Sequence, residues 1–145
     1  MSLLSALSVS ASGLSAQRTR AVLLVENLAN AETTRTPEGG PYRRKDVVFT
    51  SREQGSPFAA LFQREMGAMS TGVEVAEIWE DPRQPEKRYL PGHPDAGADG
   101  YVAFPRINPA EDMVDLMGAA RGYHANVAAM TAVKDMIQRS IDLLR

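Results

Sequence analysis

The chain has 145 residues, a net charge of −2 and no cysteine. This length suits one domain, or one small domain with extended parts. The charge balance gives no electrostatic basis for binding nucleic acid or an anionic membrane. The absence of cysteine excludes disulfides, thiolate nucleophiles and cysteine-ligated metals. The longest aliphatic run, residues 21–25, is far shorter than the roughly 20 residues needed to span a bilayer.

The N-terminal part of the chain predicts a long helix with an apolar seam, from about residue 3 to residue 30. Positions in an alternating three-four spacing are apolar in seven of eight cases, and Arg18 is the exception. The seam consists of Leu4, Leu7, Ala11, Leu14, Arg18, Ala21, Val25 and Leu28. Residues 1–17 contain no Lys or Arg, so the basic segment that opens a cleavable secretion signal is missing.

The C-terminal part predicts a second long helix that continues to Arg145. Asn108 suits the N-cap, Pro109 the first helical position, and Glu111 completes a capping box. Its seam is apolar in nine of ten positions, and Lys134 is the exception. The seam consists of Met113, Leu116, Ala120, Tyr123, Val127, Met130, Lys134, Ile137, Ile141 and Leu144.

The faces away from the two seams carry small residues instead of the charges usual on a solvated helix. Residues 1–30 contain three charged residues, and serine and glycine fill most of the outer face. Both residue types have poor helix propensity, glycine by about 1 kcal/mol relative to alanine. We therefore expect the first helix to be marginal alone and stable when neighbours cover it. The alternative is a disordered, serine-rich leader.

The middle of the chain predicts a small, turn-rich β region of three to five short strands. Residues 35–45 form a loop, residues 46–50 a strand, residues 73–79 β-favouring segments and residues 100–104 a last strand. Residues 51–72 fit either one helical turn or a loose loop. The predicted fold is therefore mainly α with a small β region.

Two parts make up this predicted architecture. Residues 1–30 and 107–145 form paired terminal helices, a coiled-coil-like hairpin, and residues 31–106 form an extended loop plus the β region. Charge is segregated, with five basic against three acidic residues in 35–53 and seven acidic against three basic residues in 74–99. Such complementary patches suit head-to-tail contacts between copies, and chance clustering on a solvated surface is the alternative.

No constellation in the sequence supports catalysis, so we expect neither an enzyme nor a cofactor. The chain has no Walker loop, GxGxxG, GxSxG or HExxH motif. His93, with Asp95 and Asp99 nearby, could supply two metal ligands through its His-x-Asp spacing, but a third is not apparent and turn formation explains this Pro- and Gly-rich loop better. His124 lies beside a seam residue and suits a packing or surface role.

The segment 27-NLANAETT-34 places two asparagines on one face where the first helix ends. Asn30 suits a left-handed or helix-ending position. Asn27 is expected to bond backbone groups of the departing chain or of a neighbouring subunit. The alternative is a lone C-cap at Asn30 with Asn27 on the surface.

Several stretches resemble one known family. The segments 12-SGLSAQRTRAVLLVENLANAETT-34, 40-GPYRRKDVVF-49, 89-YLPGHPDAGADGYVAFP-105 and 112-DMVDLMGAARGYHANVAAMTAVKDM-136 are similar, in order and spacing, to bacterial flagellar basal-body rod proteins, the proximal-rod type in particular. Glu32 and Arg106-Ile107 depart from the usual pattern, which affects local turn contacts only.

This resemblance implies a structural subunit of the rod, the drive shaft that crosses the periplasm. Its terminal helices would form the inner wall of a hollow helical assembly. The implied partners are copies of itself, other rod proteins, ring and export-gate adaptor proteins at the rod base, and the type III export apparatus. Export would proceed without a cleaved signal, and neither nucleic acid nor membrane insertion is implied. A soluble coiled-coil export chaperone and a different rod or hook paralogue are the competing interpretations.

The residues expected to carry assembly and packing lie on the two seams and at the end of the first helix. They are Leu7, Leu14, Arg18, Asn27, Leu28, Asn30, Tyr123, Val127, Lys134, Ile137 and Ile141. Arg18 and Lys134 have three possible roles: the side chain extends out of the seam, meets a partner on another subunit, or lines an export channel.

Overall fold

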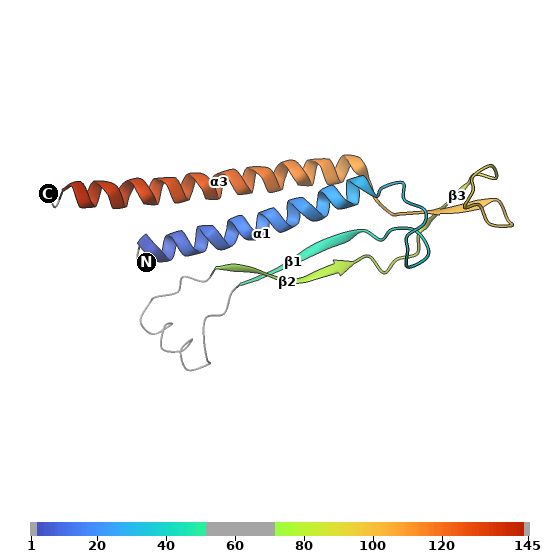
Figure 1. The fold of residues 1–145 in the computed structure, drawn as a ribbon, viewed down its shortest axis with the longest axis horizontal. Coiled ribbons are helices and arrows are strands. Elements are labelled where there is room, and N and C mark those ends of the chain that lie inside the picture. Colours follow the sequence, from blue (N-terminus) through green and yellow to red (C-terminus); the bar gives the residue numbers. More distant parts are fainter. Residues whose placement is uncertain (1–2, 52–71, 144–145) are drawn as a thin grey trace, which may run out of the picture.

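Two long helices lie side by side and run antiparallel in the computed structural model, which describes residues 3–51 and 72–143 (Figure 1). Helix α1 spans Leu3–Ala29 and helix α3 spans Pro109–Asp142. Both predicted helices are confirmed, and α3 ends at its C-cap, Leu143. Because α3 has 34 residues and α1 has 27, the C-terminal end of α3 extends past the start of α1.

The start of α3 follows its predicted signals with one difference. Asn108 is the N-cap and Pro109 occupies the first turn. The Asn108 side chain accepts a hydrogen bond from the backbone N–H of Ala110 at 3.2 Å. A capping box would instead join Asn108 to Glu111, so that detail of the prediction is wrong. Glu111 still lies in the first turn, where its charge is favourable to the helix dipole.

Small and polar residues form much of the contact between α1 and α3. The buried apolar side chains of the two helices are Ala16, Leu23, Leu24, Ala119 and Val133. Glycines allow the close approach, since an added Cβ at Gly13 would lie 2.9 Å from Asn126 Oδ1, and one at Gly122 would lie 3.1 Å from Gln17 Cδ. Arg20 and Asp115 pair across the same contact at 3.4 Å.

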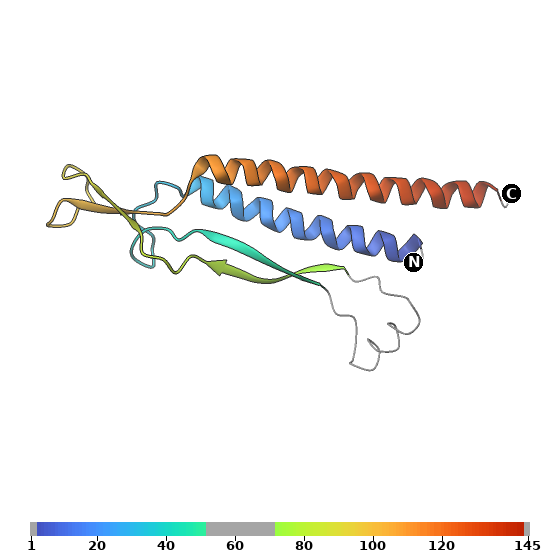
Figure 2. The same cartoon turned by 180° about the vertical axis from the view of Figure 1, so that it is seen from behind.

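A two-stranded antiparallel ribbon lies along α1, on the side away from α3 (Figures 1 and 2). It consists of β1, Lys45–Ser51, and β2, Val73–Glu80. A register shift after Val48 places one extra residue in β2. Without the extra residue, Val75 and Ile78, three positions apart, would point to opposite faces. The bulge places both on one face, together with their partners Phe49 and Val47.

A second ribbon projects beyond the end of the helix pair (Figure 2). Its strands are β3, Glu86–Tyr89, and β4, Tyr101–Phe104. The four strands of the described residues fall within the predicted three to five, although β3 was not among the segments predicted as strands. Val102 is the most deeply buried residue here, and the Arg88 guanidinium lies 4.9 Å from the centre of the Phe104 ring. Residues 52–71, for which a helical turn or a loop was expected, lie outside the described residues.

The helix contact predicts opposite responses at two glycines. Gly118→Ala should raise the free energy of unfolding by about 1 kcal/mol, because its new Cβ would meet no atom within 4 Å. Gly13→Ala should raise the free energy of unfolding by less than this, or lower it, because its new Cβ would press against Asn126. Asn126 cannot move away freely, since it donates a hydrogen bond to the Gly122 carbonyl at 2.9 Å. Urea unfolding of the purified chain measures both. Equal gains from both substitutions would contradict the close contact at Gly13.

Candidate assembly interface

The side chain of Asn27 ties the end of α1 to the start of β1. It is fully buried. Its Nδ2 donates to the Lys45 carbonyl at 2.8 Å, and its Oδ1 accepts from the Lys45 backbone N–H at 2.9 Å. The Tyr42 hydroxyl donates to the same oxygen at 3.1 Å. The expected bonds to the departing backbone are confirmed, and the alternative of a surface Asn27 is wrong.

Asn30 follows the last residue of α1 without a left-handed backbone turn. Its Nδ2 donates to the Glu26 carbonyl at 2.9 Å, and its Oδ1 accepts from the Thr33 hydroxyl at 3.1 Å. No residue other than glycine has a positive φ in the part of the chain that the structure describes. The left-handed option for Asn30 is therefore wrong, because its side-chain amide satisfies the end of the helix without that turn of the backbone.

A buried ion pair joins the same region to the start of α3. Arg44 donates to Asp112 Oδ1 through Nη2 at 2.8 Å and Nε at 3.2 Å, and Asp112 is 1% exposed. The hydrogen bond that Arg44 donates to Asp112 raises the pKa of Arg44, against the opposing effect of burial. The Arg44 carbonyl accepts from the Asp81 backbone N–H at 2.9 Å. One short segment, residues 42–45, thus holds α1, β2 and α3 together.

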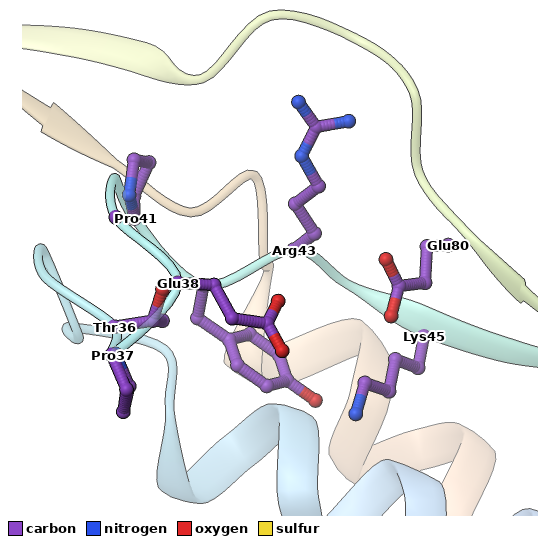
Figure 3. A pocket seen from close by; sticks show the side chains of 9 residues that line it. Thr36, Pro37, Glu38, Pro41, Arg43, Lys45 and Glu80 are labelled. Carbon is purple, nitrogen blue, oxygen red and sulfur yellow. The ribbon is translucent and has the colours of Figure 1, made fainter.

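Tyr42 stays neutral because its surroundings disfavour a phenolate. Burial, and then the charges of Glu26, Glu80 and Asp112, raise its pKa to about 12. Its ring borders an open hollow of about 240 Å³ (Figure 3). Lys45, Glu38 and Glu80 share this hollow, and Arg43 points away from Lys45.

The far end of the ribbon is attached to α1 as well. Ser12 Oγ accepts from the Val73 backbone N–H at 3.0 Å and donates to the Val9 carbonyl at 2.7 Å. An added Cβ at Gly72 would lie 2.6 Å from Ser12 Oγ, so this approach requires glycine. The ribbon is thus held to α1 at two places, by Asn27 and by Ser12.

The residues weighed as metal ligands are engaged in turn contacts. His93 Nδ1 accepts from the Asp95 backbone N–H at 3.1 Å. Asp95 also accepts from the Thr34 hydroxyl at 2.8 Å and lies 3.9 Å from Arg35. Within residues 3–51 and 72–143, no three His, Cys, Asp or Glu side chains gather as metal ligands would. His124 is exposed on α3, with its ring edge-on to Tyr123.

The apolar seams are largely outside the contact that buries α1 against α3. On α1, Leu7, Leu14 and Leu28 are half-buried. On α3, Ile137 is half-buried, whereas Tyr123 is 38%, Val127 40% and Ile141 52% exposed.

Sequence reasoning missed the face that the two helices share. The signal was present in Gly13 and Gln17 on one helix and Gly122 and Asn126 on the other, because close helix contacts use such residues. Arg18 and Lys134 are both exposed and have no ion-pair partner among the described residues.

Part of the segregated charge is paired inside the chain. Arg35 meets Asp95, Arg88 meets Glu86 at 3.2 Å, and Arg83 meets Asp81 at 2.6 Å.

No helix in the described part of the chain has a stretch long and apolar enough to cross a membrane.

Comparison with known proteins identifies the family. The model for the C-terminal part of flagellar basal body rod FlgEFG proteins matches residues 98–143, which contain β4 and α3. The flagellar basal-body rod protein FlgC of Bacillus subtilis is 42% identical over 144 residues, which cover 94% of this chain and 95% of that protein. The chain belongs to the flagellar basal-body rod protein family.

Other rod proteins of this family are similar over the same extent. FlgC of Borreliella burgdorferi is 36% identical over 151 residues, which cover 100% of this chain and 99% of that protein. FlgC of Salmonella typhimurium is 38% identical over 144 residues, with 99% and 98% covered. Near-complete coverage means that both helices and the β region between them belong to the rod-protein pattern.

The junction predicts unequal effects for the two asparagines. Asn27→Ala should lower the free energy of unfolding by about 3 kcal/mol, because each buried polar group left unpaired costs about 1–3 kcal/mol. Asn30→Ala should cost about 1 kcal/mol or less, because its bond to the Glu26 carbonyl is solvent-exposed. Urea unfolding of both variants tests this difference. Equal losses would mean that Asn27 does not hold β1.

The ion pair of Asp81 with Arg83 predicts that the free energy of unfolding depends on pH in the acid range. The hydrogen bond from Arg83 lowers the Asp81 pKa to about 2 from the ordinary 3.8. The stabilisation that ionised Asp81 gives the folded chain is therefore complete above pH 3.8 and is lost as the pH falls to about 2. Carboxyl NMR titration should show the pKa of Asp81 rising in Arg83→Gln and unchanged in Arg88→Gln. An unchanged Asp81 pKa in Arg83→Gln would refute the pairing.

Proposed function

We propose that this chain is a non-enzymatic structural subunit of the flagellar rod that assembles through its exposed helix seams. The carrying observation is that α1 and α3 meet through small and polar residues while much of their apolar surface stays uncovered. Exposed apolar residues of this kind mark interaction surfaces. The most exposed large apolar side chains on the seams are those of Leu4, Val25, Met113 and Ile141.

The assembly is helical and includes copies of this chain and other rod proteins. The terminal helices form its inner wall, and residues 31–106 make the outer contacts. The chain is elongated, with the second ribbon at one end and the overhang of α3 at the other (Figure 1). Unlike surfaces that meet head to tail generate open helical arrays.

The subunit reaches the rod unfolded, through the flagellar type III export apparatus and without signal cleavage. A helix rich in serine, and a helix contact poor in large apolar side chains, are weak in isolation and favour this route. The absence of cysteine avoids unwanted disulfides in an oxidising periplasm. Ring and export-gate adaptor proteins meet the subunit at the rod base.

Arg18 and Lys134 serve assembly or transport in this proposal. Both side chains are exposed in the single chain. A lone charge within an apolar seam sets axial register when it meets a partner on the adjacent subunit. If the charged side chain has no partner, it stays hydrated and lines the export channel.

The function is tested in the source bacterium. Deleting the chromosomal gene should abolish swimming and leave basal bodies without a complete rod, and a plasmid copy should restore both. The chain should then be found in isolated basal bodies by immunoblotting. Complementation by Asn30→Ala serves as a control for expression. A swimming deletion strain, or absence of the chain from isolated basal bodies, would contradict the function.

A further inference from the structure

No contact among residues 3–51 and 72–143 explains the glycine at position 118. It lies in the middle of α3, where glycine costs about the equivalent of a fivefold loss in helix formation relative to alanine. Gly13 and Gly122 are explained by Asn126 and Gln17, whereas an added Cβ at Gly118 would meet no atom within 4 Å. A glycine that no neighbour in the chain requires points to the close approach of a group from outside it.

The surface of α3 divides into four faces around the helix. One faces α1 and carries Ala119, Gly122 and Asn126. At 3.6 residues per turn, the seam lies about 90° to one side of that face. A row of small exposed residues, Gly118, Ala125 and Ala132, lies about 90° to the other side, roughly opposite the seam.

The seam of α1 lies on the same flank of the helix pair as the seam of α3. This follows from the pairs Gly13 with Asn126 and Gln17 with Gly122, which set the rotation of each antiparallel helix. The pair therefore has one flank of large apolar side chains. Its other flank, on α3, carries the small row, with the exposed side chains of Val114 one turn before it and Met136 one turn after it.

We propose that the α3 seam of one copy packs against the Gly118, Ala125 and Ala132 row on α3 of a second copy. Large side chains such as Tyr123 and Val127 would fill the space above the small residues. This inference rests on the proposed function and deepens it, because it names the surfaces that meet. The two surfaces lie on opposite flanks of one chain, so their contact is head to tail and continues from copy to copy.

The same arrangement leaves the fourth face of α3 uncovered. This face points away from α1 and carries His124, Ala128 and Asp135, all exposed. Met117 lies on this face as well and is 51% exposed, but the side chains of His124, Asp135 and Asp142 suit contact with water inside a hollow assembly. Helix α1 would then lie behind α3 in the wall, with its ribbon on the outside.

A bulky substitution in the small row separates this contact from folding. Ala125→Leu should leave the monomer folded, because residue 125 is exposed and leucine suits a helix. It should lower the amount of the chain in isolated basal bodies at least about tenfold, the effect of overpacking a close contact. Adding Val127→Ala on the seam should restore part of that loss. The matched control is Ala128→Leu, the same change on the fourth face, which should assemble normally.

Cross-linking tests the contact directly, because the natural chain has no cysteine. Ala125→Cys is combined in turn with Tyr123→Cys, Val127→Cys and Met130→Cys, and basal bodies are oxidised. At least one pair should give a ladder of linked copies, and each single variant should give none.

Two results overturn the inference while the proposed function stands. One is that the Ala125→Leu chain is found in basal bodies in the same amount as the wild-type chain in its own strain. The other is the absence of any ladder from the three assembled pairs. Absence of the wild-type chain from basal bodies would instead refute the function itself.

Discussion

The bonds between the Asn27 side chain and both backbone groups of Lys45 fix the end of α1 against the start of β1. They define where the helix stops and where the ribbon along α1 begins. From that point Tyr42 reaches back to Asn27, and Arg44 reaches Asp112 at the start of α3. Since Asn27 is fully buried, each of its polar groups has to be paired within the chain.

The helix pair that follows from this junction is closed by small and polar groups. Gly13, Gly122 and the Arg20–Asp115 pair bring the helices close without burying many large side chains. Such a contact contributes little hydrophobic stabilisation, which scales with the apolar area removed from water. Many large apolar side chains stay exposed in the single chain. The proposed function assigns them to contacts with other subunits, and the weak helix contact to unfolding for export.

Local patterns were enough to predict both helices, the Asn108 cap and three of the four strands. Strand β3 has only Tyr89 as a β-favouring residue and is flanked by prolines, so its pairing with β4 depends on a partner about a dozen residues away. The left-handed turn at Asn30 was wrong because a side-chain bond to Glu26 replaced it.

The contact between the helices could not be predicted from the seams. Heptad spacing identifies an apolar stripe that is expected to pack against another helix. It does not show whether that helix belongs to the same chain. Asn27 was correctly assigned to the departing backbone, whereas its bond to Tyr42 needed the fold. The ion pair of Arg44 with Asp112 joins residues 68 positions apart, and no local pattern reports such a pair.

The most direct test of the account is a cryo-electron microscopy structure of this chain in isolated basal bodies. The account predicts that the Asn27 bonds to Lys45 persist and that Tyr123, Val127 and Ile137 become buried against an adjacent subunit. Seams that stay open to solvent, with the small and polar faces of α1 and α3 separated and covered by neighbours instead, would contradict it.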